Sequence, residues 1–310
     1  MKHFSTAQIE ALELDIVQIA DALEAAFRAS ANGEIQWKPK SMVGQGDGSF
    51  LMSTFASWPS AGYGIFHMLA GATQAHTRQG HPAYRSMQLL TDAVSGEPLA
   101  FVDGSYTSTV LPAGITRLMA ARLARSRSGV AAIVGAGTQA RVNLEALDGV
   151  LPIAEVRIAS RSRASAEAFA GFVQARGQSA RVMDAGVAMF KDADIIITTV
   201  PASPDLQPAL DPAWVSRGTF VDAVDLGRSW RQGFGAFERL VVDDRAQAEQ
   251  QYREGRLVHN GPFDSEIADI LVARAPARRH DDERIALIHP GNVVGILAIT
   301  AMLHRRLGDA

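Results

Sequence analysis

An apolar run that ends in a glycine-rich turn is the part of this chain best suited to bind a phosphate. It reads Ala131-Ala132-Ile133-Val134-Gly135-Ala136-Gly137-Thr138-Gln139-Ala140, a G-x-G-x-x-A turn that opens into a helical pattern. One glycine makes the tight turn, the second lets a pyrophosphate approach the backbone, and the small third residue lets helix pack on strand. The free N–H groups at the helix N-terminus then face the anion. The turn therefore predicts a Rossmann-type dinucleotide site.

The next strand and the residues after it predict which dinucleotide binds. Residues 154–159 form a strand pattern roughly 20 residues after the turn, where the ribose-reading residue is expected. This strand runs into Ser160-Arg161-Ser162-Arg163. Hydroxyls and a guanidinium suit a 2′-phosphate, whereas an acidic residue would suit a 2′-hydroxyl. We therefore expect NADP(H) to be favoured over NAD(H); the alternative is a solvated basic loop.

Two further apolar runs predict more strands of the same sheet. They are Asp194-Ile195-Ile196-Ile197-Thr198-Thr199-Val200-Pro201 and Thr219-Phe220-Val221-Asp222-Ala223-Val224, separated by a helical stretch. Alternation of strands and helices indicates a parallel sheet that is covered on both faces. Ligands of such sheets lie beyond the carboxyl ends of the strands, so Thr198 to Pro201 and Val224 to Gly227 should face the nicotinamide. The alternative is that these residues only terminate strands.

Composition limits the classes of function. With 310 residues, the chain is long enough for two domains. A formal net charge of -3, with no basic cluster interleaved with aromatics, argues against nucleic acid and favours a small-molecule partner. The absence of cysteine excludes disulfides, thiolate metal sites and cysteine nucleophiles, and no metal site is expected. Since there is no signal-peptide pattern and no apolar stretch of roughly 20 residues, we expect a cytoplasmic protein without a membrane span.

The flanking segments predict the elements that position this site. A capping-box pattern at residues 5–8, followed by apolar residues at helical spacing up to Asn32-Gly33, predicts one long N-terminal helix. Residues 35–101 read as a mostly β module, and residues 113–124 as a helix that leads into the Rossmann unit. Residues 274–284 read as a surface connection. The apolar helix that begins after Pro290-Gly291-Asn292 should pack on the N-terminal module.

Three motifs along the chain occur in a recognisable order and spacing. They are Gly96-Glu97-Pro98-Leu99-Ala100-Phe101-Val102-Asp103-Gly104, Val134-Gly135-Ala136-Gly137-Thr138-Gln139-Ala140 and Ala193-Asp194-Ile195-Ile196-Ile197-Thr198-Thr199. With them the chain resembles the ornithine cyclodeaminase and mu-crystallin family over nearly its full length. The resemblance implies an α/β fold: a doubly wound Rossmann domain over residues 113–288, and a discontinuous α+β domain for substrate binding and dimerisation over residues 1–112 and 289–310. It also implies a nicotinamide cofactor and a small amino or imino acid.

The positions that bind the substrate carboxylate in the family differ in this chain. The family's Gly-Val-Lys segment matches Gly64-Ile65-Phe66-His67, so that Phe66 stands at the lysine position. The family's Arg-Thr-Ala-Ala segment matches an ungapped stretch that begins at Leu111, and Lys40 stands where the family usually has arginine. Since Phe66 and Leu111 cannot neutralise a carboxylate, we expect little ornithine cyclodeaminase activity unless Arg78, Arg85 or Arg228 replaces the lost cations.

The catalytic position of the family also differs. The place of its aspartate is held by Gly227, while Asp225 lies two residues earlier. Asp225 and His67 are therefore our candidates for proton transfer. The alternatives are a structural or capping role for Asp225 and a structural role for His67.

Three functions are compatible with these observations. The first is a hydride-transfer enzyme of this family, of ketimine reductase or amino-acid dehydrogenase type, with an altered substrate. The second is ornithine cyclodeaminase proper, which converts L-ornithine to L-proline and ammonia. The third is an NADP(H)-dependent binding protein without turnover. In each case we expect a homodimer formed through the N-terminal module, because the edges and apolar faces of its sheet would otherwise be open.

Overall fold

Two compact units make up the chain. The structure is a computed structural model that describes residues 1–44, 46, 49–203 and 206–308. One unit comprises Met1–Leu111 with Asn292–Ala310, and the other Pro112–Gly291. The domain boundaries expected from the sequence, at residues 112 and 289, differ from these by one and three residues. The assignment of substrate binding and dimerisation to the first unit stays a prediction.

The larger unit is built on an eight-stranded sheet in which every pair is parallel, with strand order β13-β12-β14-β11-β10-β7-β8-β9. The strands are β7 (Val130–Val134), β8 (Glu155–Ala159), β9 (Ser179–Val182), β10 (Ile195–Thr198), β11 (Phe220–Ala223), β12 (Arg239–Val242), β13 (Ser265–Glu266) and β14 (Ile285–Ile288). The helices that follow them are α5 (Thr138–Glu145), α6 (Arg163–Ala175), α7 (Val187–Phe190), α8 (Arg245–Arg253) and α9 (Ile267–Leu271). The chain runs outward from β7 to β9 and then returns to β10, so the strand order reverses beside β7. This is the point at which open α/β sheets bind their ligands, and the expected Rossmann-type fold is confirmed.

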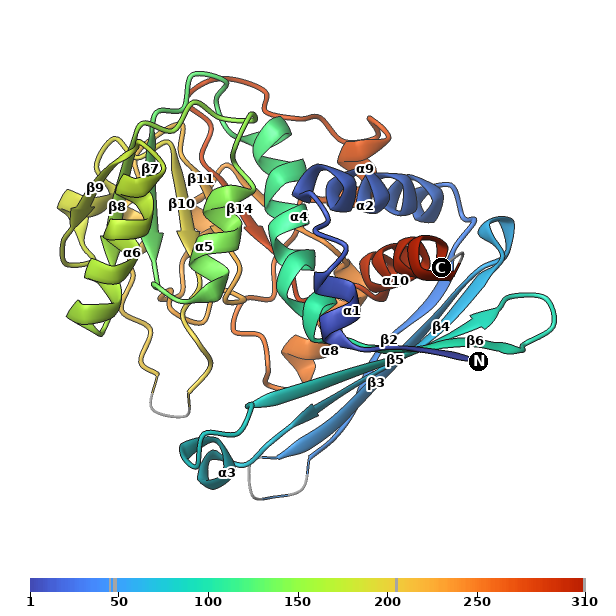
Figure 1. Cartoon of the computed structure of the whole chain (residues 1–310). Helices are drawn as coiled ribbons and strands as arrows, with labels where there is room; N and C mark the ends of the chain where they lie inside the picture. Colours follow the sequence, from blue (N-terminus) through green and yellow to red (C-terminus); the bar gives the residue numbers. More distant parts are fainter. Residues whose placement is uncertain (45, 47–48, 204–205, 309–310) are drawn as a thin grey trace. The chain divides into compact units, whose positions relative to one another are not determined.

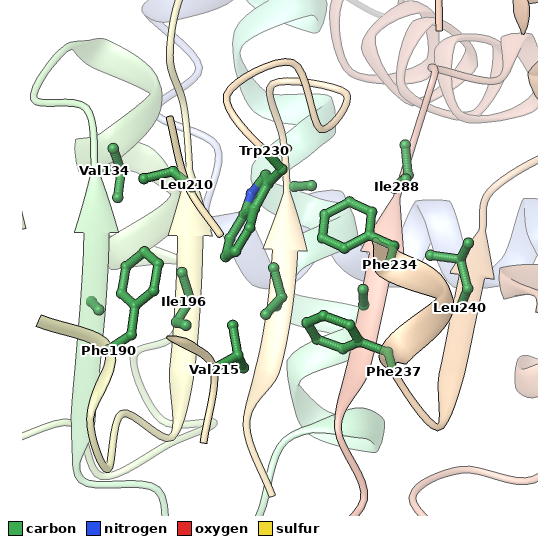
Figure 2. Close-up of a cluster of buried hydrophobic side chains, with 14 of the residues drawn as sticks. Val134, Phe190, Ile196, Leu210, Val215, Trp230, Phe234, Phe237, Leu240 and Ile288 are labelled. Atoms are coloured by element: carbon green, nitrogen blue, oxygen red, sulfur yellow. The ribbon is translucent and has the colours of Figure 1, made fainter. Parts of the chain in front are cut away.

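A chain of aromatic side chains covers part of this sheet (Figure 2). The ring of Trp230 lies 5.5 Å from that of Phe190 and 5.4 Å from that of Phe234, which in turn contacts Phe237. All four side chains are less than a tenth exposed and join one cluster with Val134, Ile196, Leu210 and Ile288. Burial of this much apolar surface fixes the segment after β11 against the sheet.

The smaller unit contains a six-stranded sheet with the order β1-β6-β5-β4-β3-β2 (Figure 1). Its strands are β1 (Lys2–Phe4), β2 (Gln36–Gly44), β3 (Phe50–Trp58), β4 (Tyr63–Gly71), β5 (Tyr84–Asp92) and β6 (Pro98–Asp103), with α3 (Gln74–Arg78) between β4 and β5. Only β1 pairs in parallel, with β6. The apolar helix α10 (Val293–Gly308) packs on α2 (Ile16–Ala31) and contacts β3, β4 and β5. Its expected place on the N-terminal module is confirmed.

Three expectations for the helices and strands need correction. The capping box at Ser5 and Gln8 is confirmed, but the single N-terminal helix is wrong: α1 (Thr6–Glu10) ends early, and α2 begins separately after its cap Asp15. The linker helix α4 (Ser105–Leu123) begins eight residues before the expected Ala113, because the Asp103 carboxylate accepts from the Ser105 backbone N–H. The strands β9, β12 and β14 were not expected. The fully buried strands β12 and β14 show no alternation in sequence, and β14 directly follows the stretch that reads as a surface connection, while β9 has only four residues and none of them is buried.

Within the described ranges, no helix combines the length and the apolar character that a bilayer crossing requires.

Candidate functional site

The turn after β7 has the geometry that a dinucleotide phosphate needs. Gly135 adopts φ +114°, and a Cβ there would lie 2.2 Å from Thr199 Oγ1, so only glycine fits. Gly137 is the N-cap of α5, and no side chain among the described residues caps this helix. The first N–H groups of α5 are therefore available to an anion, beside the exposed Thr138.

A pocket of about 260 Å³ continues from this turn past the end of β8. It is lined by Val134, Ala159, Ser160, Arg161, Met183, Asp184, Ala185, Val200, Leu206, Gln207, Ala209, Leu210 and Ser229. Arg161 is exposed and makes no ion pair with another described residue, whereas Arg163 pairs with Glu167. The Ser162 hydroxyl accepts from the Ser165 backbone as the N-cap of α6. The uncapped turn and this pocket together fit a dinucleotide, and Ser160 and Arg161 are placed to contact it.

Thr198 and Asp225 meet in a buried network at the carboxyl end of β10. Thr198 Oγ1 donates to Asp225 Oδ1 over 2.8 Å and accepts from Trp230 Nε1 over 3.2 Å. The other carboxylate oxygen of Asp225 accepts from Ser229 Oγ over 2.5 Å. Burial raises the pKa of Asp225, although these hydrogen bonds and the charge of Arg228 oppose the shift. The network thus brings together Thr198 and Asp225, two of the residues predicted from the sequence, and the Thr198 hydroxyl is hydrogen-bonded within it.

The neighbouring predicted residues lie around this network. The Thr199 backbone N–H donates to Val134 O over 2.8 Å, and Val200 lines the pocket. Pro201 is exposed and Val224 is half-buried. The structure thus places Val200 at the pocket, while the contacts of Pro201 and Val224 with a cofactor stay predictions.

A second buried network was not found from the sequence. His289 Nε2 lies 2.9 Å from Asp222 Oδ1, and Thr116 Oγ1 lies 2.7 Å from Asp222 Oδ2 and 2.5 Å from Asn143 Oδ1. Burial is the largest single effect and lowers the pKa of His289, but the charge and hydrogen bond of Asp222, together with the charges of Asp243 and Asp225, outweigh it, so the net shift is upward. The sequence signal for this site is weak. His289 follows the apolar run of β14 directly, as Thr199 follows β10.

In the smaller unit, the side chains of Lys40 and His67 lie near each other on the buried face of the sheet. A β-bulge between Lys38 and Ser41 sets Lys40 on the buried face, where it is 8% exposed. His67 Nε2 lies 3.0 Å from Ser86 Oγ. Burial, with the nearby charge of Lys40, lowers the pKa of His67 to about 3. At neutral pH His67 is therefore an uncharged imidazole that can accept a proton but has no imidazolium proton to give.

The strand register corrects the residue that stands beside Lys40. His67 pairs with Thr54 on the buried face, whereas Phe66 pairs with Phe55 on the opposite face and is 59% exposed. Of these two neighbouring residues, His67 and not Phe66 therefore shares the buried face with Lys40. Leu111 is buried, and its Cδ1 would meet a Cβ placed on Gly295 of α10 at 2.5 Å.

The structure places two of the three arginines that could replace the cations lost at Phe66 and Leu111. Arg85 pairs with Ala70 across the sheet and thus lies on the face of Phe66. Arg228 lies near Asp225 in the larger unit. The side chain of Arg78 lies outside the described residues.

Comparison with known proteins supplies a family. The model of the ornithine cyclodeaminase/mu-crystallin family matches residues 2–294. Alanine dehydrogenase of Archaeoglobus fulgidus is 26% identical over 308 residues, covering 96% of this chain and 92% of the relative. Ketimine reductase mu-crystallin of Mus musculus is 26% identical over 261 residues, covering 83% and 81%. An archaeal alanine dehydrogenase dimer with bound NAD has the same fold, with a TM-score of 0.87 and 23% identity over 100% of this chain and 96% of that one.

The burial of neutral His67 predicts a loss of stability in acid. Below pH 6.5 the unfolded chain binds a proton at this residue that the folded chain, with its pKa near 3, does not bind, so unfolding is favoured as pH falls. Urea unfolding at pH 7.5 and 5.5 should show that His67→Gln removes on the order of 1 kcal/mol of this pH dependence. The control is His81→Gln. Because the His81 side chain is exposed, this substitution should leave the pH dependence of stability unchanged. An equal pH dependence in wild type and His67→Gln would contradict the assignment.

Proposed function

Because the chain belongs to the ornithine cyclodeaminase/mu-crystallin family, we propose that it is an enzyme that transfers hydride between a nicotinamide dinucleotide and a small amino or imino compound. The observation that carries this proposal is the uncapped turn at Gly135, which opens into the pocket beyond β8. The names of its relatives, alanine dehydrogenase and ketimine reductase, support the same class of reaction. The cofactor supplies the hydride chemistry when bound, and the chain supplies binding, orientation and proton transfer.

The dinucleotide we propose is NADP(H). Arg161 and Ser160 line the pocket at the end of β8, where the ribose is read, and no described residue forms an ion pair with Arg161. A free guanidinium and a hydroxyl suit the 2′-phosphate, because charge-assisted hydrogen bonds to phosphate are strong and can be bidentate. Asp184 lines the same pocket and is the group that would oppose a phosphate placed close to it.

Binding constants test the cofactor preference. NADPH should bind more tightly than NADH, and Arg161→Ala should weaken NADPH by about 1.5–3 kcal/mol while changing NADH little, because only NADPH carries the phosphate. Arg163→Ala is the matched control, since Arg163 pairs with Glu167 instead of facing the pocket. Equal affinities for both dinucleotides in wild type would refute the proposal.

We propose that Lys40 and His67 bind the substrate. Lys40 offers a positive charge for a carboxylate, and the neutral His67, positioned by Ser86, offers a hydrogen bond or accepts a proton. Asp225 remains a candidate acid or base, since burial favours its protonated form. Lys40 is the one cation of this arrangement. The arrangement therefore fits a compact imine that carries a single carboxylate better than L-ornithine, which carries two ammonium groups besides its carboxylate.

Two matched imines test the substrate class. NADPH consumption should be faster, in kcat/KM, with Δ1-pyrroline-2-carboxylate than with Δ1-pyrroline, which lacks the carboxylate. Lys40→Gln should cost the first substrate about tenfold or more, the value of a lost charge-assisted bond, and leave the second unchanged. Proline formation from L-ornithine at about one per second or faster would favour a cyclodeaminase. Tight NADPH binding without turnover of any imine, amino acid or keto acid would favour a binding protein.

A homodimer formed through the smaller unit is also proposed. Phe55, Phe66 and Leu51 are 47%, 59% and 45% exposed on one face of its sheet, and the ring centroids of Phe55 and Phe66 lie 5.6 Å apart at a tilt of 33°. An exposed apolar face of this kind marks an interaction surface. The strands β1 and β2 are its edges. A solved structure of the same fold is described as a dimer, which supports a second copy as the partner.

Light scattering at micromolar concentration tests this surface. Wild type should be a dimer and Phe66→Asp a folded monomer, because a buried unpaired carboxylate is costly in an apolar interface. Val187→Asp places the same charge on an exposed residue of the other unit and should remain dimeric. A wild-type monomer, or a dimer in the Phe66→Asp variant, would argue against this face.

A further inference from the structure

A second cavity of about 200 Å³ lies in the larger unit, apart from the dinucleotide pocket. It is formed by the segment after β11 and by the loop after α8, and it is lined by Gln232, Gly233, Phe234, Gly235, Leu240, Tyr252, Val258, His259, Asn260 and Gly261. No residue lines both this cavity and the pocket beyond β8. The space would hold about seven water molecules at 30 Å³ each, enough for a small organic molecule.

His259 is the buried titratable group of this cavity, and two neighbours, Phe234 and Gly227, fix its ring. It is 7% exposed, and its ring centroid lies 4.4 Å from that of Phe234. Gly227, at φ +72°, leaves room for it, because a Cβ there would lie 2.7 Å from His259 Cδ2. His259 Nε2 lies 3.3 Å from the Gly227 carbonyl oxygen. The ring is therefore held in one orientation relative to the cavity.

The contact with Gly227 also decides the tautomer. A carbonyl oxygen can only accept a hydrogen bond, so His259 Nε2 carries the hydrogen and Nδ1 keeps its lone pair. Burial lowers the pKa of His259, which keeps the ring neutral near pH 7. No hydrogen bond links Nδ1 to another described residue. His259, which lines the cavity, therefore carries an acceptor nitrogen with no hydrogen-bond donor among the described residues.

The charge and polarity of the other lining residues indicate which kind of ligand would fit the cavity. None of the described residues that line the cavity carries a formal charge. The side-chain amides of Gln232 and Asn260 present both donors and acceptors, and three glycines expose backbone groups. Phe234 supplies an aromatic surface. A carboxylate or ammonium group would find no counter-charge among these described residues.

We propose that this cavity is a second small-molecule site, which binds an uncharged primary carboxamide through an N–H···Nδ1 hydrogen bond to His259. The carboxamide matches the lining because it offers N–H donors and a carbonyl acceptor on one planar group. Among the described residues, this site shares no lining residue with the dinucleotide pocket.

Three isosteric probes test the proposal on the full chain saturated with NADPH. Calorimetric titration should show benzamide binding with a Kd of about 1 mM or below, which is within reach of a ligand of this size. Benzoate, which is charged, and acetophenone, which lacks the N–H donor, should bind about tenfold more weakly or not at all. Saturation with NADPH keeps the probes out of the dinucleotide pocket.

Two variants locate the binding site. His259→Phe keeps an aromatic ring but removes the acceptor, so benzamide affinity should fall about tenfold while acetophenone is unchanged. Asn260→Ala alters an exposed residue of the lining and should weaken benzamide severalfold without threatening the fold. The affinity for NADPH should be the same in both variants and wild type. Absence of benzamide binding at 10 mM, equal binding of benzoate, or full affinity in both variants would overturn the proposal.

Discussion

Two backbone hydrogen bonds at the end of β7 fix the part of the fold on which the dinucleotide site depends. The Gly135 N–H donates to Ala159 O and the Thr199 N–H donates to Val134 O, both over 2.8 Å. These hydrogen bonds link the carboxyl ends of β7, β8 and β10, so that the three strands end side by side. Because Thr199 fills the space where a Cβ of residue 135 would lie, the turn closes tightly and directs the free N-terminus of α5 toward the pocket. The positions of Ser160, Arg161 and Val200 follow from this register.

The cost of removing charge from water explains the state of the candidate proton-transfer groups. Burial raises the pKa of the Asp225 carboxyl and lowers that of the His67 imidazole, so both groups are driven toward their neutral forms. His289 differs because the carboxylate of Asp222 lies against it and, together with the charges of Asp243 and Asp225, outweighs the same cost. With a pKa near 3 the His67 imidazole is a weak base that is suited to hydrogen bonding at neutral pH, whereas Lys40 is suited to holding an anion.

The segment after β11 shapes both candidate sites of the larger unit. Near the start of this segment, Asp225 is hydrogen-bonded to Thr198. Farther along, the aromatic residues Trp230 and Phe234 anchor the segment to the sheet (Figure 2). Gly227 lies between these parts, and its left-handed conformation leaves space that the His259 ring occupies. A side chain at residue 227 would have to displace that ring. The residue that the resemblance matches to the family's aspartate thus packs against a residue that lines the second cavity.

The sequence by itself determined what depends on local chemistry. The turn at Gly135, the strands that end near Ala159 and Thr198, the Rossmann-type fold and the apolar final helix were all predicted, because glycine spacing and apolar runs are local signals. The tertiary structure decided what depends on register and on long-range pairing. Only the pairing of β3 with β4 shows that His67, and not Phe66, faces Lys40, because neighbouring residues of a strand point to opposite faces. Likewise, only the meeting of β11 with β14 brings His289 to Asp222, and only the loop after α8 brings His259 to Gly227. These contacts join residues 32 or more positions apart in the chain, and no periodicity within a short window records them.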